Sequence, residues 1–302
     1  MPGSTDPTPV DAELLRSWPL PEPGESKYSR GDVLVVGGAR GTPGGAILAG
    51  VAALRSGAGR LTFAVAESVA SAVAVAVPES AVIGLAEDAS GSVTSDAYSR
   101  LEGPLNGTDA VLIGPGLDDL AETRGLLTQL LPRIPQHVGV CLDAYALAAL
   151  AELEGATGRR FDRLVLTPNK EEAAVLGDVD VDDLPTAIRA IALRHRATVA
   201  CYDVVADETG RSWRGIPGSA GLGTSGSGDV RAGIVTGLLA RGATPSQAAI
   251  WGSHVHAAAG ERLAARVGRL GYLARELAVE IPGVIDEIEQ GARPSRGAET
   301  ER

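Results

Sequence analysis

Residues 221–242 read Gly-Leu-Gly-Thr-Ser-Gly-Ser-Gly-Asp-Val-Arg-Ala-Gly-Ile-Val-Thr-Gly-Leu-Leu-Ala-Arg-Gly, a loop of glycine, serine and threonine that runs directly into a helical pattern. Val230, Ile234 and Leu238 recur every four residues, and Gly242 stands where the helix is expected to end. Glycine lets the backbone approach a ligand closely, and the first turn of a helix offers unpaired N–H groups to an anion. The stretch therefore predicts a phosphate-binding loop.

Asp229 closes this loop, although a carboxylate beside a phosphate is repelled by it. Its place is reasonable if Asp229 takes a proton from a hydroxyl that attacks a phosphoryl group. The loop is not a Walker A motif, because Ser227 stands where the lysine belongs, and its glycines do not follow the dinucleotide-binding order. A flexible Gly/Ser linker is the structural alternative, but such a linker does not usually enter a well-patterned helix.

The composition is that of a globular protein with a full core, in one large domain or two small ones. The chain has 302 residues, of which 44% are hydrophobic and 22% charged. A net charge of −11 and only 3% aromatic residues argue against a nucleic-acid partner. The N-terminus does not resemble a signal peptide and no apolar run reaches membrane-spanning length, so a cytoplasmic protein is expected. Cys141 and Cys201 stand in strand-like contexts and are expected to be buried thiols.

Apolar runs alternate with helical patterns through most of the chain, which predicts an α/β fold with one doubly wound, mostly parallel sheet flanked by helices in three layers. Strands are expected within 32–38, 60–66, 81–85, 109–114, 137–143, 164–169, 197–201 and 204–206. Ligand-type loops follow several of these strands, at 37–43, 114–118, 143, 168–172 and 221–229. Since the carboxyl ends of parallel strands meet at one edge, these loops are expected to form one site.

The domain boundaries are expected near residues 26 and 290. Residues 1–26 form a proline-rich arm with a short helix from Asp11, which is either a disordered tail or laid over a neighbouring subunit. Residues 27–290 form a single catalytic domain, with one helix near 274–280 and another after Pro282. Residues 291–302 are polar and are expected to be disordered.

These loops, in this order, resemble the ribokinase-like superfamily and, within it, the ADP- or ATP-dependent NAD(P)H-hydrate dehydratases. The chain is similar to a divergent member of that family without the fused epimerase domain of some relatives. The stretches that carry the resemblance lie at 33–38, 43–46, 52–59, 111–116, 142–147, 166–168, 226–230 and 232–233. The motif Gly-Ser-Gly-Asp at 226–229 indicates the superfamily, whereas Ala-Leu-Arg-Ser-Gly-Ala-Gly and Ile-Gly-Pro-Gly indicate the dehydratases.

The resemblance implies a repair reaction, in which the ring hydroxyl of NADH or NADPH hydrate is phosphorylated from ADP or ATP and lost as phosphate. Asp229 would be the catalytic base, with Mg²⁺ as cofactor and Glu172 acting on a metal-bound water. A homo-oligomer, a tetramer by resemblance, is expected. The substrate-binding residues implied are Gly45, Ala46, Gly116, Asn169 and Asp229. The nucleotide- and phosphate-binding residues implied are Thr224, Ser225, Gly226, Ser227, Gly228, Tyr202 and Asp203.

The sequence departs from the family pattern at four places. Asn-Lys-Glu-Glu at 169–172 replaces the usual His-Pro-Gly-Glu, Tyr145 replaces an aspartate, and Asp118 replaces a glycine. The strand that normally carries a phosphate-facing lysine reads Ala-Cys-Tyr-Asp at 200–203. Two other functions stay open: a small-molecule kinase of the vitamin-precursor type, favoured by Asn-x-x-Glu, and a non-catalytic nucleotide-binding protein, favoured by the missing lysine.

Three residues near the motif have structural interpretations as well. His254 and His256 are two apart on a predicted helix, which is poor spacing for a metal, so packing or capping is expected. Arg231 could touch phosphate, but an arginine in the first turn of a helix is more often solvated.

Overall fold

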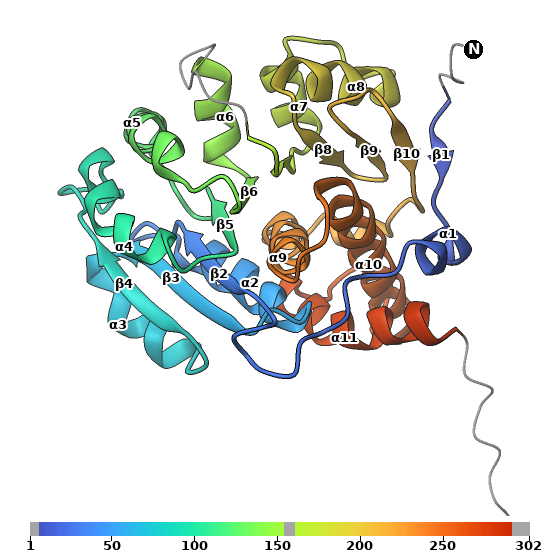
Figure 1. Ribbon diagram of the computed structural model, residues 1–302, viewed down its shortest axis with the longest axis horizontal. Helices are drawn as coiled ribbons and strands as arrows, with labels where there is room; N and C mark the ends of the chain where they lie inside the picture. The colour runs from blue at the N-terminus through green and yellow to red at the C-terminus, as the bar shows by residue number, and fades with distance from the viewer. Residues whose placement is uncertain (1–5, 154–160, 292–302) are drawn as a thin grey trace, which may run out of the picture.

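The computed structural model describes residues 6–153 and 161–291, and within them ten strands form a single sheet (Figure 1). Its strand order is β1-β10-β9-β8-β7-β6-β5-β2-β3-β4. The strands are β1 (Thr8–Pro9), β2 (Asp32–Val36), β3 (Arg60–Ala66), β4 (Ala81–Leu85), β5 (Ala110–Ile113), β6 (Gly139–Leu142), β7 (Leu164–Leu166), β8 (Thr198–Cys201), β9 (Val204–Ala206) and β10 (Ser212–Arg214).

The sheet is parallel from β8 to β4, as predicted, and becomes antiparallel at β9 and β10. Val35 of β2 pairs with Phe63 of β3 on one side and with Leu112 of β5 on the other. The chain therefore winds outward from β2 through β3 to β4, returns to β5 on the opposite side of β2, and winds outward again. Ligands of doubly wound sheets bind at the carboxyl ends of the strands beside such a reversal.

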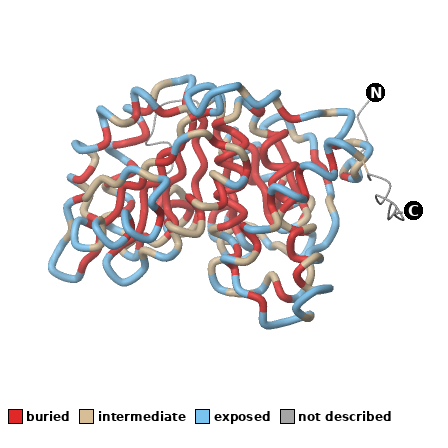
Figure 2. The backbone as a smooth tube through the Cα atoms, turned by 90° about the horizontal axis from the view of Figure 1, so that it is seen from below, coloured by how far each residue is buried: buried red, intermediate tan, exposed pale blue. Residues whose placement is uncertain are grey.

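Helices cover both faces of the sheet, so the fold has three layers (Figure 1). Alternate strand residues separate two cores: Val33 and Val35 face the one with α2, α9, α10 and α11, and Leu34 and Val36 face the one with α5 to α8. Figure 2 shows that burial is concentrated along the strands. The helices are α1 (Ala12–Ser17), α2 (Pro43–Arg55), α3 (Glu67–Ala76), η1 (Ser95–Arg100), α4 (Glu102–Leu105), α5 (Leu120–Leu130), η2 (Leu131–Arg133), α6 (Tyr145–Glu152), α7 (Lys170–Gly177), α8 (Leu184–His195), η3 (Ala220–Leu222), α9 (Ser227–Ala240), α10 (Pro245–Arg266) and α11 (Ala274–Gln290).

The two helices expected on either side of Pro282 are one continuous helix, α11. A proline inside a helix removes one backbone hydrogen bond and usually kinks or ends the helix. Here Leu277, Ile281, Val284 and Ile288 form an unbroken buried stripe through the proline. Packing of this stripe against the domain keeps the segment helical, because tertiary contacts outweigh local propensity.

The N-terminal arm lies against its own chain from residue 6 onward. Its helix α1 begins after Asp11, whose side chain accepts from the amide of Leu14 at 2.8 Å. The side chains of Gln247 and Trp251, both on α10, donate to the backbone carbonyls of Pro19 and Trp18 at 2.7 and 3.0 Å. The interpretation as a disordered tail is therefore wrong for residues 6–26, while residues 1–5 and the expected C-terminal tail from 292 onward lie outside the described residues.

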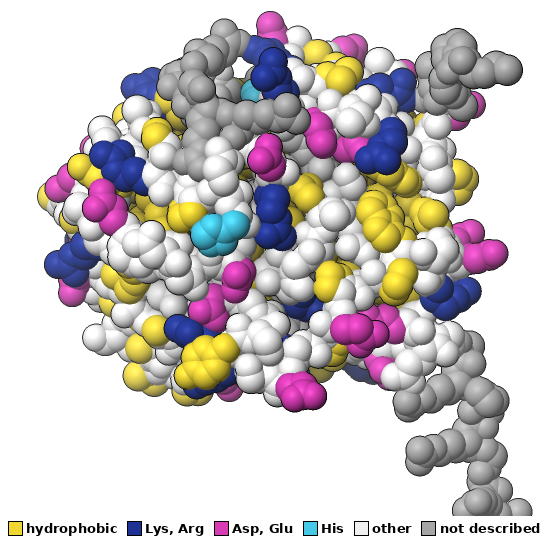
Figure 3. All heavy atoms as spheres, in the orientation of Figure 1, with side chains coloured by type: hydrophobic (Ala, Val, Ile, Leu, Met, Phe, Trp, Pro, Cys, Tyr) yellow, Lys and Arg dark blue, Asp and Glu magenta, His cyan; other side chains and the backbone are white. Residues whose placement is uncertain are grey.

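The surface mixes charges of both signs. On the face drawn in Figure 3, acidic and basic side chains are interspersed among polar and apolar ones. None of the helices within 6–153 and 161–291 is both long and apolar enough to cross a membrane. Cys141 and Cys201 are free and buried, as expected.

Candidate active site

The loops that follow β2, β5 and β6 are in direct backbone contact. The amide of Gly38 donates to the carbonyl of Pro115 at 2.9 Å, and the hydroxyl of Thr42 donates to the carbonyl of Gly116 at 2.8 Å. Gly114 has a φ of 129°, and a β-carbon there would lie 1.8 Å from the carbonyl oxygen of Asp143. The predicted meeting of these loops at the carboxyl edge of the sheet is confirmed.

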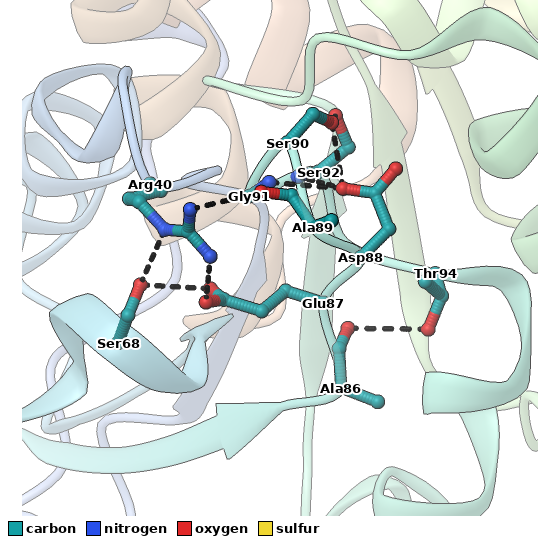
Figure 4. Close-up of polar contacts among 10 residues, drawn as sticks. All are labelled: Arg40, Ser68, Ala86, Glu87, Asp88, Ala89, Ser90, Gly91, Ser92 and Thr94. Carbon is teal, nitrogen blue, oxygen red and sulfur yellow. Dashed lines mark hydrogen bonds and ion pairs between the residues drawn. The ribbon is translucent and has the colours of Figure 1, made fainter.

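A network around Arg40 anchors the loop after β2 from the outer side (Figure 4). The Arg40 guanidinium donates to Glu87, to the hydroxyl of Ser68 at 3.3 Å and to the carbonyl of Ala89 at 3.2 Å. The backbone amide of Arg40 also donates to the carbonyl of Gly91 at 2.9 Å. The bend at 86–94 and the start of α3 thus hold this loop beside the site.

The glycine-rich loop leads into α9 as predicted. Gly226 is the N-cap with a φ of 87°, a left-handed conformation that favours glycine. The amide of Ser227 donates to the carbonyl of Thr224 at 3.2 Å, so it is used within the loop. In the described part of the chain, the amides of Gly226, Gly228 and Asp229 have no protein acceptor. The amide of Ser227, a residue implied to bind phosphate, is therefore not available to an anion, whereas the amide of Asp229 is.

Asp229 lies between the glycine-rich loop and the start of α2. A β-carbon placed on Gly45 would be 3.3 Å from both carboxylate oxygens of Asp229 and 3.0 Å from the amide nitrogen of Gly116. Ala46, the next residue of α2, is fully buried. Burial and, secondly, the charge of Glu172 raise the pKa of Asp229 to about 6. The structure thus brings the predicted base together with Gly45, which also lies against Gly116, whereas these contacts do not include Asn169.

Asp143, at the end of β6, is a second carboxylate behind Asp229. It is 5% exposed, and it accepts a hydrogen bond from the hydroxyl of Thr167 at 2.8 Å. Burial and, secondly, the charge of Asp229 raise its pKa to about 6, while Arg231 and the Thr167 hydrogen bond oppose the rise.

Asn169 and Glu172 begin α7 and bond to each other's backbone. The amide of Glu172 donates to the side-chain oxygen of Asn169 at 2.9 Å, and the amide of Asn169 donates to the Glu172 carboxylate at 2.8 Å. This capping box leaves the Asn169 side-chain NH₂ as a donor for a ligand. Burial raises the pKa of Glu172, and the charge of Asp143 acts in the same direction.

Arg231 is buried, which corrects the expectation of a solvated side chain. It is 7% exposed, and its Nη2 donates to the carbonyls of Thr167 at 2.7 Å and Pro168 at 3.1 Å. The side chain therefore turns from the first turn of α9 toward the end of β7 instead of toward solvent.

A pocket of about 440 Å³ is lined in part by the glycine-rich loop, and neither Gly45 nor Asp229 is among its lining residues. Of the predicted site residues it contains Asn169, Tyr202, Thr224, Ser227 and Gly228. The lining residues are Asn169, Tyr202, Ile216, Gly218, Ser219, Ala220, Leu222, Gly223, Thr224, Ser227, Gly228, Arg231, Ser253, His256 and Ala257.

The remaining predicted nucleotide residues lie outside the lining of this pocket. Asp203 forms an ion pair with Arg214 at 2.9 Å and lines a small cavity between β9, β10 and α10. Ser225 and Gly226 belong to the same loop as Thr224 but do not line the pocket. Tyr202 and Asp203 form the turn from β8 to β9. The Lys170 ammonium lies 6.0 Å from the centroid of the Tyr202 ring.

His256 and Ser253 of α10 are pocket residues that the sequence did not indicate as site residues. The Ser227 hydroxyl lies 2.9 Å from Nε2 of His256. Burial and, secondly, the charge of Arg231 lower the pKa of His256 to about 3, so the ring is neutral. Among residues 6–153 and 161–291, no group of three or more His, Cys, Asp or Glu could hold a metal ion.

A family model described as NAD(P)H-hydrate dehydratase matches residues 33–283. The chain belongs to the NAD(P)H-hydrate dehydratase family. It is 41% identical over 292 residues to the ADP-dependent (S)-NAD(P)H-hydrate dehydratase of Xanthomonas campestris pv. campestris, with 93% of this chain and 97% of that relative covered. It is 34% identical to the bifunctional NAD(P)H-hydrate repair enzyme Nnr of Moorella thermoacetica, covering 92% of this chain and 54% of that relative. The chain thus spans about half the length of that bifunctional relative.

Solved structures show the same fold. The ADP/ATP-dependent NAD(P)H-hydrate dehydratase of Bacillus subtilis, co-crystallised with ATP/Mg²⁺, has a TM-score of 0.77 at 24% identity, covering 95% of this chain and all of that one. A ribokinase-like superfamily protein of Enterococcus faecalis has a TM-score of 0.79 at 21% identity, covering 94% and 96%. The predictions of a ribokinase-like α/β fold and of the dehydratase family are confirmed.

Proposed function

We propose that this chain is an ADP-dependent NAD(P)H-hydrate dehydratase that repairs NADH and NADPH hydrate, with ATP as the other possible donor. The observation that carries the proposal is the position of Asp229. Its carboxylate lies beside Gly45, and the loop that leads to it lines a pocket large enough for a nucleotide. A base between an open, glycine-walled surface and a phosphate loop suits the transfer of a phosphoryl group to a hydroxyl.

Asp229 would take the proton of the ring hydroxyl as its oxygen attacks the terminal phosphorus of the nucleotide. The free amides of Gly226, Gly228 and Asp229 would stabilise the charge on the transferring group. Asn169 would orient the hydrate through its side-chain NH₂. Phosphate then leaves from the ring carbon as the neighbouring carbon loses a proton, and the ring double bond is restored.

The donor groups of the site suit Mg²⁺ held mainly by the nucleotide. Mg²⁺ keeps several waters and is usually bound through one or two carboxylates together with substrate phosphates. The hydrogen bond from the Asn169 amide engages Oε2 of the Glu172 carboxylate, which leaves Oε1 able to hold a metal-bound water. When bound, the ion would neutralise phosphate charge.

The decisive experiment mixes the purified protein with NADH hydrate, Mg²⁺ and either ADP or ATP. Recovery of dihydronicotinamide absorbance together with release of inorganic phosphate is expected. A phosphorylated product that accumulates without phosphate release would instead indicate a kinase, the function that Asn-x-x-Glu at 169–172 favours. Nucleotide binding without either product would indicate a non-catalytic relative.

We also propose that the chain forms a homo-oligomer in the cytoplasm, as the resemblance implies. Leu270 and Leu273 lie on a single segment between α10 and α11 and are 71% and 46% exposed. Apolar side chains of this size gathered at one place are typical of association surfaces. Light scattering should give a mass above that of one chain, and Leu270→Glu should reduce it; a monomer mass for the wild type would contradict the proposal.

A further inference from the structure

We infer that Arg231 is a phosphate-binding residue, whose guanidinium holds the polyphosphate of the nucleoside diphosphate or triphosphate in the pocket. This inference rests on the proposed function, because it assigns the nucleotide to this pocket. It goes further in naming the cation that binds the anionic part of that ligand.

The first observation is that Arg231 has unused donors while buried. Its Nη2 is engaged by the carbonyls of Thr167 and Pro168. Its Nε is buried without a hydrogen-bond partner, and no acceptor for Nη1 is found in the described part of the chain. A buried N–H without an acceptor is unfavourable, because it has lost its hydrogen bonds to water. An anion in the pocket would supply acceptors to these donors.

The second observation is that nothing neutralises the guanidinium directly. Within 6–153 and 161–291, no carboxylate lies within the 4.0 Å of an ion pair to Arg231. Asp143 and Glu172 interact with it only through longer-range charge, which opposes the rise that burial causes in the pKa of each carboxyl. The charge is therefore still available to an anionic ligand.

The third observation is the charge of the lining itself. Of the fifteen lining residues, Arg231 is the one with a permanent positive charge, because the lining contains no lysine or second arginine and His256 is neutral. Arg231 lines this pocket together with Thr224, Ser227 and Gly228 of the loop. Guanidinium suits this role because its planar fork matches phosphate oxygens in pairs.

The carbonyl contacts fix the direction of the side chain. Two bonds from Nη2 hold the guanidinium against the end of β7, so Nε and Nη1 are oriented without loss of further side-chain entropy when an anion binds. Arg163 is a natural control, because its Nη2 donates in the same way to the carbonyls of Leu239 and Ala243 at 2.8 and 3.1 Å, at the far end of α9.

The test measures ADP, AMP and inorganic pyrophosphate binding by calorimetry for the wild type, Arg231→Gln, Arg231→Lys and Arg163→Gln. Arg231→Gln is expected to weaken ADP binding about ten- to hundredfold, the usual range for a hydrogen bond to a charged group. The affinity for AMP should fall less than the affinity for ADP. Arg163→Gln should bind ADP like the wild type. Arg231→Lys should fall between, because it keeps the charge but not the fork. If the affinity for pyrophosphate falls in parallel with the affinity for ADP, the effect lies at the phosphates. If the wild type binds pyrophosphate more tightly than ADP, the pocket is a site for the free anion.

Two outcomes overturn the inference. One is unchanged ADP affinity in Arg231→Gln with a lower melting temperature, which would make Arg231 a structural counter-charge. The other outcome decides the question if Arg231→Gln does not fold. It is that Arg231→Lys binds ADP with the affinity of the wild type but binds AMP more weakly than the wild type does. Hydrate turnover by the wild type is measured separately, so ADP binding without turnover contradicts the proposed function and leaves the inference standing.

Discussion

The Ser227 hydroxyl lies 2.9 Å from Nε2 of His256, which joins the first residue of α9 to the middle of α10. His256 is neutral, since its pKa is lowered to about 3 mainly by burial. The histidine therefore holds Ser227 by a hydrogen bond without placing a charge beside the phosphate loop. It acts as a positioning residue for the loop.

Replacement of His256 with alanine should loosen this loop. Leaving the Ser227 hydroxyl without its buried partner costs about 1–3 kcal/mol, so the free energy of unfolding should fall and ADP affinity should drop several-fold. His254→Ala on the same helix is the matched control, because His254 lines the small cavity with Asp203 instead of the pocket. Equal ADP affinities in both variants would rule out the positioning role, while His256→Gln, which can bond to Ser227, should restore part of the affinity.

Asp229→Asn should remove turnover of NADH hydrate and leave ADP binding nearly unchanged. The amide cannot accept the hydroxyl proton, and loss of a general base typically costs about 10²- to 10⁴-fold in rate. The asparagine is isosteric, so the packing beside Gly45 is kept. Stopped assays of phosphate release with saturating ADP check this; turnover near that of the wild type would mean that another group is the base.

The pH dependence of turnover follows from the raised pKa of Asp229, about 6. The base must be ionised, so the rate should be level above pH 6 and fall about tenfold per pH unit below it. Asp143 titrates in the same range. The profile should therefore be repeated on Asp143→Asn, in which the acid limb should persist. A limb centred near pH 4 in both proteins would contradict the buried environment of Asp229.

Asp143→Asn should make the folded protein more stable at alkaline pH. The pKa of Asp143 rises from 3.8 to about 6 on folding, so its stabilising contribution is present below pH 3.8 and is lost as the pH rises through 6. The shift corresponds to about 3 kcal/mol at pH 8. Asparagine keeps the oxygen that accepts from Thr167. Urea unfolding at pH 8 should show the gain, which should vanish near pH 4; a loss of stability at pH 8 would show that the charge itself holds Arg231 in place.

Local features of the sequence predicted the sheet, the glycine-rich loop and Asp229, because each depends on residues close together in the chain. Arg231 and His256 could not be assigned in the same way. Their roles depend on contacts with residues 63 to 64 and 29 positions away, and neither the first turn of a helix nor the pattern His-x-His indicates such contacts. The prediction that the helix breaks at Pro282 was wrong for a related reason, because the buried stripe that keeps α11 continuous depends on tertiary packing. Asp203 lies away from the pocket because the turn into β9 directs it to Arg214.

The glycines at the start of α2 offer a paired test of where the hydrate binds. Gly44 and Gly45 are neighbours in the first turn, but an added β-carbon meets nothing within 4 Å at Gly44. At Gly45 it would lie 3.3 Å from both Asp229 carboxylate oxygens and 3.0 Å from the Gly116 amide nitrogen, where the attacking hydroxyl must approach its base. Gly45→Ala should therefore lower kcat/KM for the hydrate at least tenfold with unchanged ADP affinity. Gly44→Ala should keep activity and gain about 0.5–1 kcal/mol of stability, because alanine is the better helix former. If both variants turned over the hydrate equally, the substrate would have to reach Asp229 from another side.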